Sequence, residues 1–213
     1  MKKLLGFKKG MTQIFDETGN VVPVSVIEAG PCFVTQIKTE EKDGYNAIQI
    51  GFGATKKANK PAKGHLGEIS AKHLREIRVD KPEDFKVGQE IKVEMFQPGE
   101  AIEISGVSIG KGFQGNIKRH HHHRGPMSHG SKSHRITGSI GAGTTPGRVL
   151  KGQAMPGRMG GVNVTVDGLK VVRVDAGNNL LLVKGSVPGK PGNLVMISAE
   201  GEFPKKVEEK TNA

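Results

Sequence analysis

Short runs of apolar and β-branched residues, separated by turn-forming residues, make up most of this chain of 213 residues. Glu17-Thr18-Gly19-Asn20 and Lys42-Asp43-Gly44 are typical of the turns between them. Regular spacing of such runs predicts a mainly β fold, an antiparallel barrel or sandwich, and we favour an antiparallel β-barrel. The predicted strands are residues 12–15, 21–27, 33–38, 47–52, 91–95, 101–108, 162–166, 169–174, 180–183 and 194–198.

One segment has the spacing of a helix instead. Leu66, Ile69, Leu74 and Ile77 fall roughly on one helical face, which predicts a helix over residues 68–78 within a small helical insertion of about 60–85. A basic loop precedes this helix. Lysines on a loop are more often simply solvated, so this loop is a weaker candidate for binding a polyanion than the basic region described next. Its lysines are Lys56, Lys57, Lys60 and Lys63.

The charge of the chain is concentrated in one region. Between Ile104 and Val166 there is no aspartate or glutamate, and nine of the 32 Lys and Arg residues lie there. The remaining 23 basic residues nearly balance the 21 acidic ones, so this region supplies +9 of the formal charge of +11. It is rich in glycine and too poor in apolar residues to build its own core. A long basic loop without acidic partners needs a polyanion to neutralise and order it.

The basic region interrupts the β domain. The sequence therefore predicts a discontinuous barrel made of residues 1–108 and 162–203, an extension over 109–161 and a disordered tail over 204–213. Each limb of the extension could reach roughly 40 Å, about half its fully extended length. Loops of this length are rare in compact domains and usually mark function.

The composition points to the cytoplasm. Cys32 is the only cysteine, so the chain has no intrachain disulfide and suits a reducing compartment. No run of about 18 apolar residues predicts a membrane span. The opening MKKLLGFKKGM is interrupted by Lys8 and Lys9 and is not expected to act as a signal peptide. The basic region lacks the bulky apolar face of a membrane-surface helix, so we expect no membrane partner.

Gly110, Gly112 and Gly115 match the G-x-G-x-x-G pattern of dinucleotide-binding proteins. The pattern should open an apolar helix and be followed by an acid about 20 residues later, but no acid occurs before Asp167. The same region fails as a P-loop, because Gly112 stands where Ser or Thr is required. We interpret the glycines as letting the backbone approach a phosphate chain, with Lys111 beside them.

Four consecutive histidines, His120 to His123, could indicate a metal site. The region offers no carboxylate as ligand or orienting group, so we favour imidazoles that face phosphates. His129 and His134 lie among serines, again without the acid that nucleophilic catalysis needs. We expect no catalytic residue, metal, cofactor or small-molecule substrate. A metal- or nucleotide-dependent enzyme on a β-barrel remains the alternative.

RNA is the expected partner. Lys and Arg neutralise phosphates, while Gly and Pro let a chain follow grooves and junctions. Charge alone would suit DNA equally well, but the sequence has no basic recognition helix or zinc finger, and an irregular arm suits folded RNA better. The predicted RNA contacts are Lys111, Lys118, Arg119, His120, Arg124, His129, Lys132, His134, Arg135, Arg148, Lys151, Gln153 and Arg158.

Several motifs carry a family resemblance that covers almost the whole chain except the tail. Residues 96–119, FQPGEAIEISGVSIGKGFQGNIKR, closely resemble the signature of bacterial large-subunit ribosomal protein three. Glu103 is a mild departure, since the family usually has Asp or Asn there. Further similar segments are residues 6–15, 133–135 with 138–141, 145–148 with 151–152, and 172–175.

The resemblance implies a six-stranded barrel of the translation-factor type with an inserted helical part and a long extension. It also implies binding near the 3′ end of the large-subunit (23S-type) rRNA early in assembly, with large-subunit proteins 14 and 19 as neighbours in the cytoplasmic ribosome. The tip of the extension, near the peptidyl-transferase centre, would be Ala142, Gly143, Thr144, Thr145, Pro146 and Gly147, with residues 155–160 on the neighbouring loop. Some members carry a methylated glutamine at the position of Thr144, so that modification is expected to be absent here.

Overall fold

The computed structural model describes residues 1–55, 57–67, 69–201 and 203. Lys56 of the basic loop and the predicted disordered tail, 204–213, lie outside these residues. The chain divides into two compact units, and each is described by itself. The first unit is Met1–Val107 with the described chain from Asn163 onward, and the second unit is Ser108–Val162.

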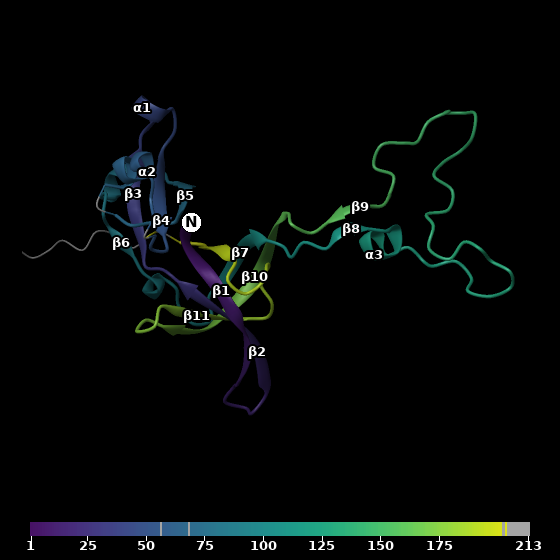
Figure 1. Ribbon diagram of the computed structural model, residues 1–213. Helices are drawn as coiled ribbons and strands as arrows, with labels where there is room; N and C mark the ends of the chain where they lie inside the picture. Colours follow the sequence, from purple (N-terminus) through teal and green to yellow (C-terminus); the bar gives the residue numbers. More distant parts are fainter. Residues whose placement is uncertain (56, 68, 202, 204–213) are drawn as a thin grey trace, which may run out of the picture. The chain divides into compact units, whose positions relative to one another are not determined.

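A closed barrel of six antiparallel strands forms the centre of the first unit (Figure 1). All six pairs of neighbouring strands around the barrel are joined by antiparallel registers that hold one apolar face inward, for example Ile197 opposite Ile104. This confirms the prediction of a mainly β chain with an antiparallel barrel. In order around the barrel the strands are β1 (Lys2–Phe15), β12 (Leu194–Ala199), β7 (Ala101–Val107), β10 (Asn163–Asp175), β11 (Leu180–Lys184) and β2 (Val21–Ala29).

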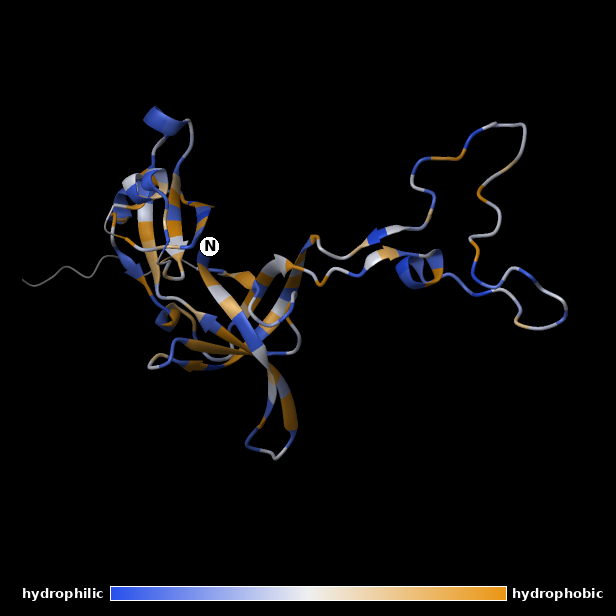
Figure 2. Cartoon of the chain, in the orientation of Figure 1, coloured by the Kyte–Doolittle hydropathy of each residue, from blue (hydrophilic) through white to orange (hydrophobic). Residues whose placement is uncertain are grey.

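Alternation of side chains along these strands builds the core. On β7, Ile102 and Ile104 are buried while Glu103 between them is only half-buried. Leu5, Ile27 and Leu181 are 0% exposed and belong to the same cluster. Figure 2 shows the resulting alternation of hydrophobic and hydrophilic positions along the strands. Burial of these aliphatic side chains is the main term that stabilises the barrel.

A second, four-stranded antiparallel sheet also belongs to the first unit. Its order is β5 (His73–Arg78), β4 (Ala47–Phe52), β3 (Cys32–Lys38) and β6 (Glu90–Ile91). The described helices of this unit are all short: α1 (Glu40–Asp43), α2 (Lys60–Leu66) and the 3-10 helices η1 (Pro82–Asp84) and η2 (Val93–Met95).

The predicted helix over residues 68–78 is wrong. Residues 73–78 form strand β5, which pairs with β4 so that Ile77 lies opposite Ile48. Ile77 is buried at 2% exposure, and Arg75 and Arg78 are exposed on the strand. The apparent helical spacing combined Leu66, which ends α2, with apolar residues of a separate strand. A free edge of β4 offers that strand a ladder of backbone hydrogen bonds, and this tertiary pairing outweighs local spacing.

Three predicted strands differ in extent. The predicted strands 162–166 and 169–174 form, from Asn163 onward, one strand, β10, whose register shifts between Val166 and Leu169 where Gly168 has φ +70°. Residues 91–95 form only the end of β6 and then η2. The turn over 175–179 joins the two strands β10 and β11.

Strand β1 begins ten residues earlier than predicted, at Lys2. Lysines at positions 2, 3, 8 and 9 interrupt the apolar pattern, yet Lys8 is 9% exposed. Its Nζ donates hydrogen bonds to the carbonyl oxygens of Val187 and Gly189, each at 2.8 Å. A buried ammonium is tolerated here because backbone acceptors satisfy it.

Candidate nucleic-acid interface

The second unit is closed at its base by a small antiparallel pairing, which we call the neck (residues 108–120 and 154–162). Strand β8 (Gly112–Gln114) pairs with β9 (Gly157–Met159). The N–H of Ser108 donates to the carbonyl of Val162 at 2.9 Å, and the N–H of Gly161 donates to the carbonyl of Ser108 at 3.1 Å. The N–H of Lys111 donates to the carbonyl of Met159 at 2.9 Å. The two limbs therefore leave the neck as a pair held in register.

Two glycines allow this close approach. Gly160 has φ +70°, and a Cβ there would overlap the carbonyl oxygen of Ile109. A Cβ on Gly157 would overlap the guanidinium of Arg119. These glycines serve contact between the two limbs, a role that the sequence alone did not reveal.

A short helix, α3 (Asn116–His120), follows β8 in the first limb and is hydrogen-bonded to the second limb. Asn116 is 1% exposed, and its Nδ2 donates to the carbonyl of Ala154 at 2.9 Å. Nη1 of Arg119 donates to the carbonyl of Met155 at 2.7 Å, and Nε2 of His120 lies 3.1 Å from the same oxygen. Arg119 and His120 thus each have a partner within the chain, although Arg119 has further N–H groups to offer.

The remainder of the second unit, residues 121–153, is the distal loop. One turn in it is held by the N–H of Gly125, which donates to the carbonyl of His134 at 2.9 Å. Nδ1 of His134 lies 2.8 Å from the carbonyl of Pro126. At the predicted tip, the N–H of Gly147 donates to the carbonyl of Gly143 at 3.2 Å, and all six tip residues are exposed. Figure 2 shows mostly hydrophilic and neutral colours along this loop.

Eight of the nine cations of the second unit are exposed, and Arg119 is half-buried. The ion pairs found among the described residues join Lys2 to Glu100, Lys9 to Glu28, Lys38 to Glu76 and Lys92 to Glu90, all in the first unit. Nothing in the second unit compensates its charge. The exposed cations are Lys111, Lys118, Arg124, Lys132, Arg135, Arg148, Lys151 and Arg158.

The residues that the sequence singled out fall into two groups in the structure. The neck carries Lys111, Lys118, Arg119, His120 and Arg158. The distal loop carries the rest: Arg124, His129, Lys132, His134, Arg135, the tip residues, Arg148, Lys151 and Gln153. Of these, His134 is half-buried, and His129 and Gln153 are exposed. The candidate interface is therefore a short base held by hydrogen bonds, followed by a long exposed loop.

The side chains of the histidine run, His120 to His123, do not gather around one point. The rings of His120 and His122 lie 6.1 Å apart, and His121 has a left-handed backbone with φ 58°. In the described residues, no three side chains of His, Cys, Asp or Glu gather closely enough to hold a metal ion. The glycine pattern at 110–115 leads into α3, a five-residue helix with a basic last turn, rather than a long apolar helix.

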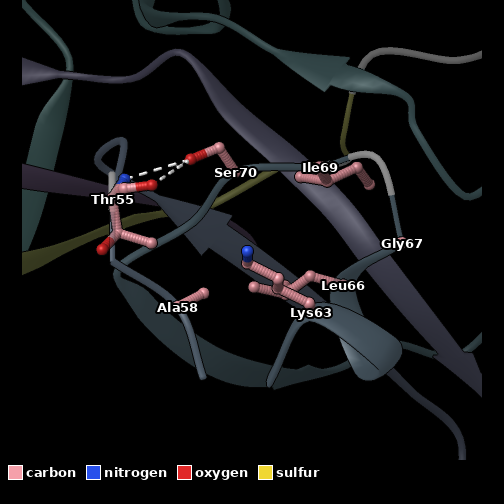
Figure 3. Close-up of a pocket in the computed structure, with 7 residues that line it drawn as sticks. All are labelled: Thr55, Ala58, Lys63, Leu66, Gly67, Ile69 and Ser70. Atoms are coloured by element: carbon pink, nitrogen blue, oxygen red, sulfur yellow. Dashed lines mark hydrogen bonds between the residues drawn. The ribbon is translucent and has the colours of Figure 1, made fainter. Parts of the chain in front are cut away.

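A pocket of about 220 Å³ lies beside the basic loop of the first unit (Figure 3). Its hydrogen bonds are internal: Ser70 Oγ donates to the carbonyl of Thr55 and accepts from the N–H of Thr55, each at 3.0 Å. Lys63, which lines the pocket, is exposed, as are Lys57 and Lys60 of the basic loop. The lining residues are Thr55, Ala58, Lys63, Leu66, Gly67, Ile69 and Ser70.

Sequence reasoning missed the neck. Strands of three residues are too short to show alternation, and Asn116 carries no local signal of burial. One signal was present: glycines cluster at both ends of the acid-free region, at 110, 112 and 115 and again at 157, 160 and 161. Such mirrored clusters are typical of two backbones that approach each other closely.

Across the part of the chain that the structure covers, no helix has the length and apolar character to cross a bilayer.

The chain is similar to known proteins along most of its length. Residues 65–180 match the family model of ribosomal protein L3. The large ribosomal subunit protein uL3 of Trichormus variabilis is 57% identical over 199 residues, covering 91% of this chain and 94% of the relative. The protein of the same name from Prochlorococcus marinus strain MIT 9215 is 54% identical over 213 residues, covering 98% of each chain. This chain belongs to the family of ribosomal protein L3.

Proposed function

We propose that this chain is a structural constituent of the large ribosomal subunit that binds the subunit's RNA directly and performs no chemistry. The relatives named above are large ribosomal subunit proteins. The observation that carries the proposal is the set of eight exposed cations in a unit that holds no acidic residue. Charges left uncompensated within the chain are available to phosphates, and their binding releases counterions.

The neck and the distal loop have different parts in this binding. The neck's hydrogen bonds align the two limbs, and Arg119 and His120 tie α3 to the carbonyl of Met155. The distal loop has few internal contacts, and its cations bind phosphates along the RNA. Residues 109–161 thus act as an extension that enters folded RNA while the barrel stays outside. Phosphate contacts position such a segment without reading sequence.

The resemblance supports a finer placement. The barrel is of the translation-factor type, the binding site lies near the 3′ end of the 23S-type rRNA, and the chain helps to nucleate assembly of the subunit in the cytoplasm. The tip, residues 142–147, supports RNA near the peptidyl-transferase centre. Thr144 leaves the tip without a methylatable glutamine at that position. Large-subunit proteins 14 and 19 are its neighbours.

Binding to RNA fragments tests the proposal. The full chain should bind a 3′-terminal fragment of large-subunit RNA more tightly than a 5′-terminal fragment of equal length. A distal-loop variant with five cations changed to Gln should lose most of this affinity. It carries Arg124→Gln, Lys132→Gln, Arg135→Gln, Arg148→Gln and Lys151→Gln.

The matched control removes the same charge from exposed lysines of the first unit and should bind almost as the unchanged chain does. It carries Lys42→Gln, Lys81→Gln, Lys86→Gln, Lys184→Gln and Lys190→Gln, all at exposed positions. Equal losses in both variants would mean that affinity follows net charge alone and not the extension. Saturable nucleotide binding by the free chain, abolished by changing His129 or His134, would favour the enzyme alternative.

A further inference from the structure

The far half of the β1–β2 hairpin forms a two-stranded ribbon, residues 10–24. Strand β1 pairs with β12 only as far as Phe7, and β2 pairs with β11 only from Val24 onward. Among the described residues, the ladder beyond these points joins the two strands to each other, and one further bond runs from the N–H of Gly185 to the carbonyl of Pro23 at 2.9 Å. Figure 1 shows the hairpin continuing past the neighbouring strands of the barrel. An unsupported ribbon of this kind is marginally stable in water and gains most from a partner.

One face of the ribbon is apolar and exposed. The register sets Phe15 opposite Val21 and Gln13 opposite Pro23, so these side chains share a face with Met11. Met11 is 53% exposed, Phe15 66% and Val21 54%, and Pro23 is exposed as well. We call Met11, Phe15, Val21 and Pro23 the ribbon face. Clustered exposed Met and aromatic side chains are enriched at protein interfaces.

The ribbon also has a charge opposite to that of the second unit. From Gly10 to Ile37 the chain has no Lys, Arg or His, although its formal charge is +11. The segment contains three acids, and Glu28 is paired with Lys9 at 2.7 Å. The two at the tip, Asp16 and Glu17, remain exposed.

Asp16 is held in its charged form. Its Oδ1 accepts hydrogen bonds from the hydroxyl of Thr18 at 2.7 Å and from the N–H of Asn20 at 2.8 Å. The Thr18 hydroxyl, and then the Asn20 backbone, lower the pKa of Asp16. A fixed negative tip repels phosphate, so the ribbon is poorly suited to RNA.

We propose that the ribbon face is a docking surface for a second, basic protein of the large subunit. Met11 and Phe15 enter an apolar pocket on that protein, and Lys or Arg side chains of the partner lie near Asp16 and Glu17. This inference rests on the proposed function, because it places the chain within a particle made of RNA and basic proteins. The chain then joins two partners through surfaces of opposite charge: RNA through the second unit and a protein through the ribbon.

A second copy of this chain is a poorer occupant. A two-fold contact brings the same patch together from both copies, and residues 10–24 contain acids but no Lys, Arg or His to pair with them. Like charges brought together at an interface are unfavourable. The partner therefore differs from this chain and carries positive charge.

Removing the apolar anchors should weaken docking without touching RNA binding. The double variant Met11→Thr with Phe15→Thr should leave the large subunit about tenfold faster under a high-salt wash than the unchanged chain, since anchors of this kind dominate interface energies. Its affinity for free RNA should stay within about twofold, because no charge changes. Thermal unfolding of the free variant should match the unchanged chain, and equal release rates would overturn the proposal.

Photo-crosslinking identifies the occupant directly. Benzoylphenylalanine replaces Phe15 in the full chain, which is incorporated into large subunits and irradiated. The control position is Ile136 in the distal loop, which is 66% exposed as Phe15 is. Position 15 should join a peptide of another ribosomal protein that contains Lys or Arg, and position 136 should join RNA.

The two positions separate failure of the inference from failure of the proposed function. A crosslink from position 15 to RNA, to this chain, to a second copy, to an acidic peptide or to nothing overturns the inference. If position 136 joins RNA in the same particles, the proposed function still stands. If the chain does not enter subunits and position 136 finds no RNA, the proposed function fails and this inference fails with it.

Discussion

The salt dependence of RNA binding can be worked out from the exposed charges of the second unit. Eight of its cations are exposed, and the ninth, Arg119, donates to the carbonyl of Met155. Each phosphate contact contributes about 0.7 to 0.9 to the slope of log affinity against log salt. Eight contacts therefore give a slope of about −6 to −7. Affinity should fall by roughly three to four orders of magnitude between about 50 and about 200 mM salt.

Single charge removals sharpen this prediction. Arg135→Gln in the distal loop should reduce the steepness of the slope by about 0.7 to 0.9, because one counterion fewer is released. Lys190→Gln, at an exposed lysine of the first unit, should leave the slope unchanged. Filter binding or fluorescence anisotropy with a 3′-terminal RNA fragment over a salt series measures both. A slope shallower than about −3, or equal changes in the two variants, would refute the assignment of phosphate contacts to the extension.

Three further predictions concern stability and the neck. Ile104→Ala, which truncates a fully buried side chain of β7, should cost about 2–5 kcal/mol in urea unfolding, whereas Val107→Ala on the same strand, 45% exposed, should cost less than about 0.5 kcal/mol. Gly160→Ala should speed amide exchange at the neck and weaken RNA binding, while Gly110→Ala, with open space around its Cβ, should do neither. Burial first, and then nearby positive charges, lower the pKa of His73 from 6.5. The contribution of neutral His73 to the free energy of unfolding should be complete above about pH 6.5 and should fall as the pH drops through the folded-state pKa. Unfolding measured at about pH 7.5 and at about pH 5 should therefore show a smaller loss of stability in His73→Phe than in the unchanged chain.

The strands could be located from the sequence because their apolar alternation is set by one buried face. This worked for 33–38, 47–52 and 180–183, where aliphatic side chains face the core and turns bound the run. It failed where a long-range contact decides the structure. Lysines obscured the first half of β1 because Lys8 finds its acceptors on a loop nearly 180 residues away. No local sequence pattern indicates such a distant hydrogen-bond partner.

The helix prediction failed for a related reason. Helical spacing over four apolar positions was weaker evidence than the open edge of β4, which only the folded sheet provides. The acid-free region, by contrast, could be recognised from composition alone, because absence of acids over 60 residues is a property of the sequence. Its neck depends on contacts between limbs separated by about 40 residues of chain, such as Asn116 to Ala154, and these had to come from the structure.

The central claim is that RNA supplies the counter-charge that orders the distal loop, and amide hydrogen exchange tests it most directly. In the free protein, residues 121–153 should exchange at nearly unprotected rates, while the barrel strands stay protected. In purified large subunits the same residues should become strongly protected. Strong protection of 121–153 in the free protein, unchanged on entering the subunit, would contradict the account.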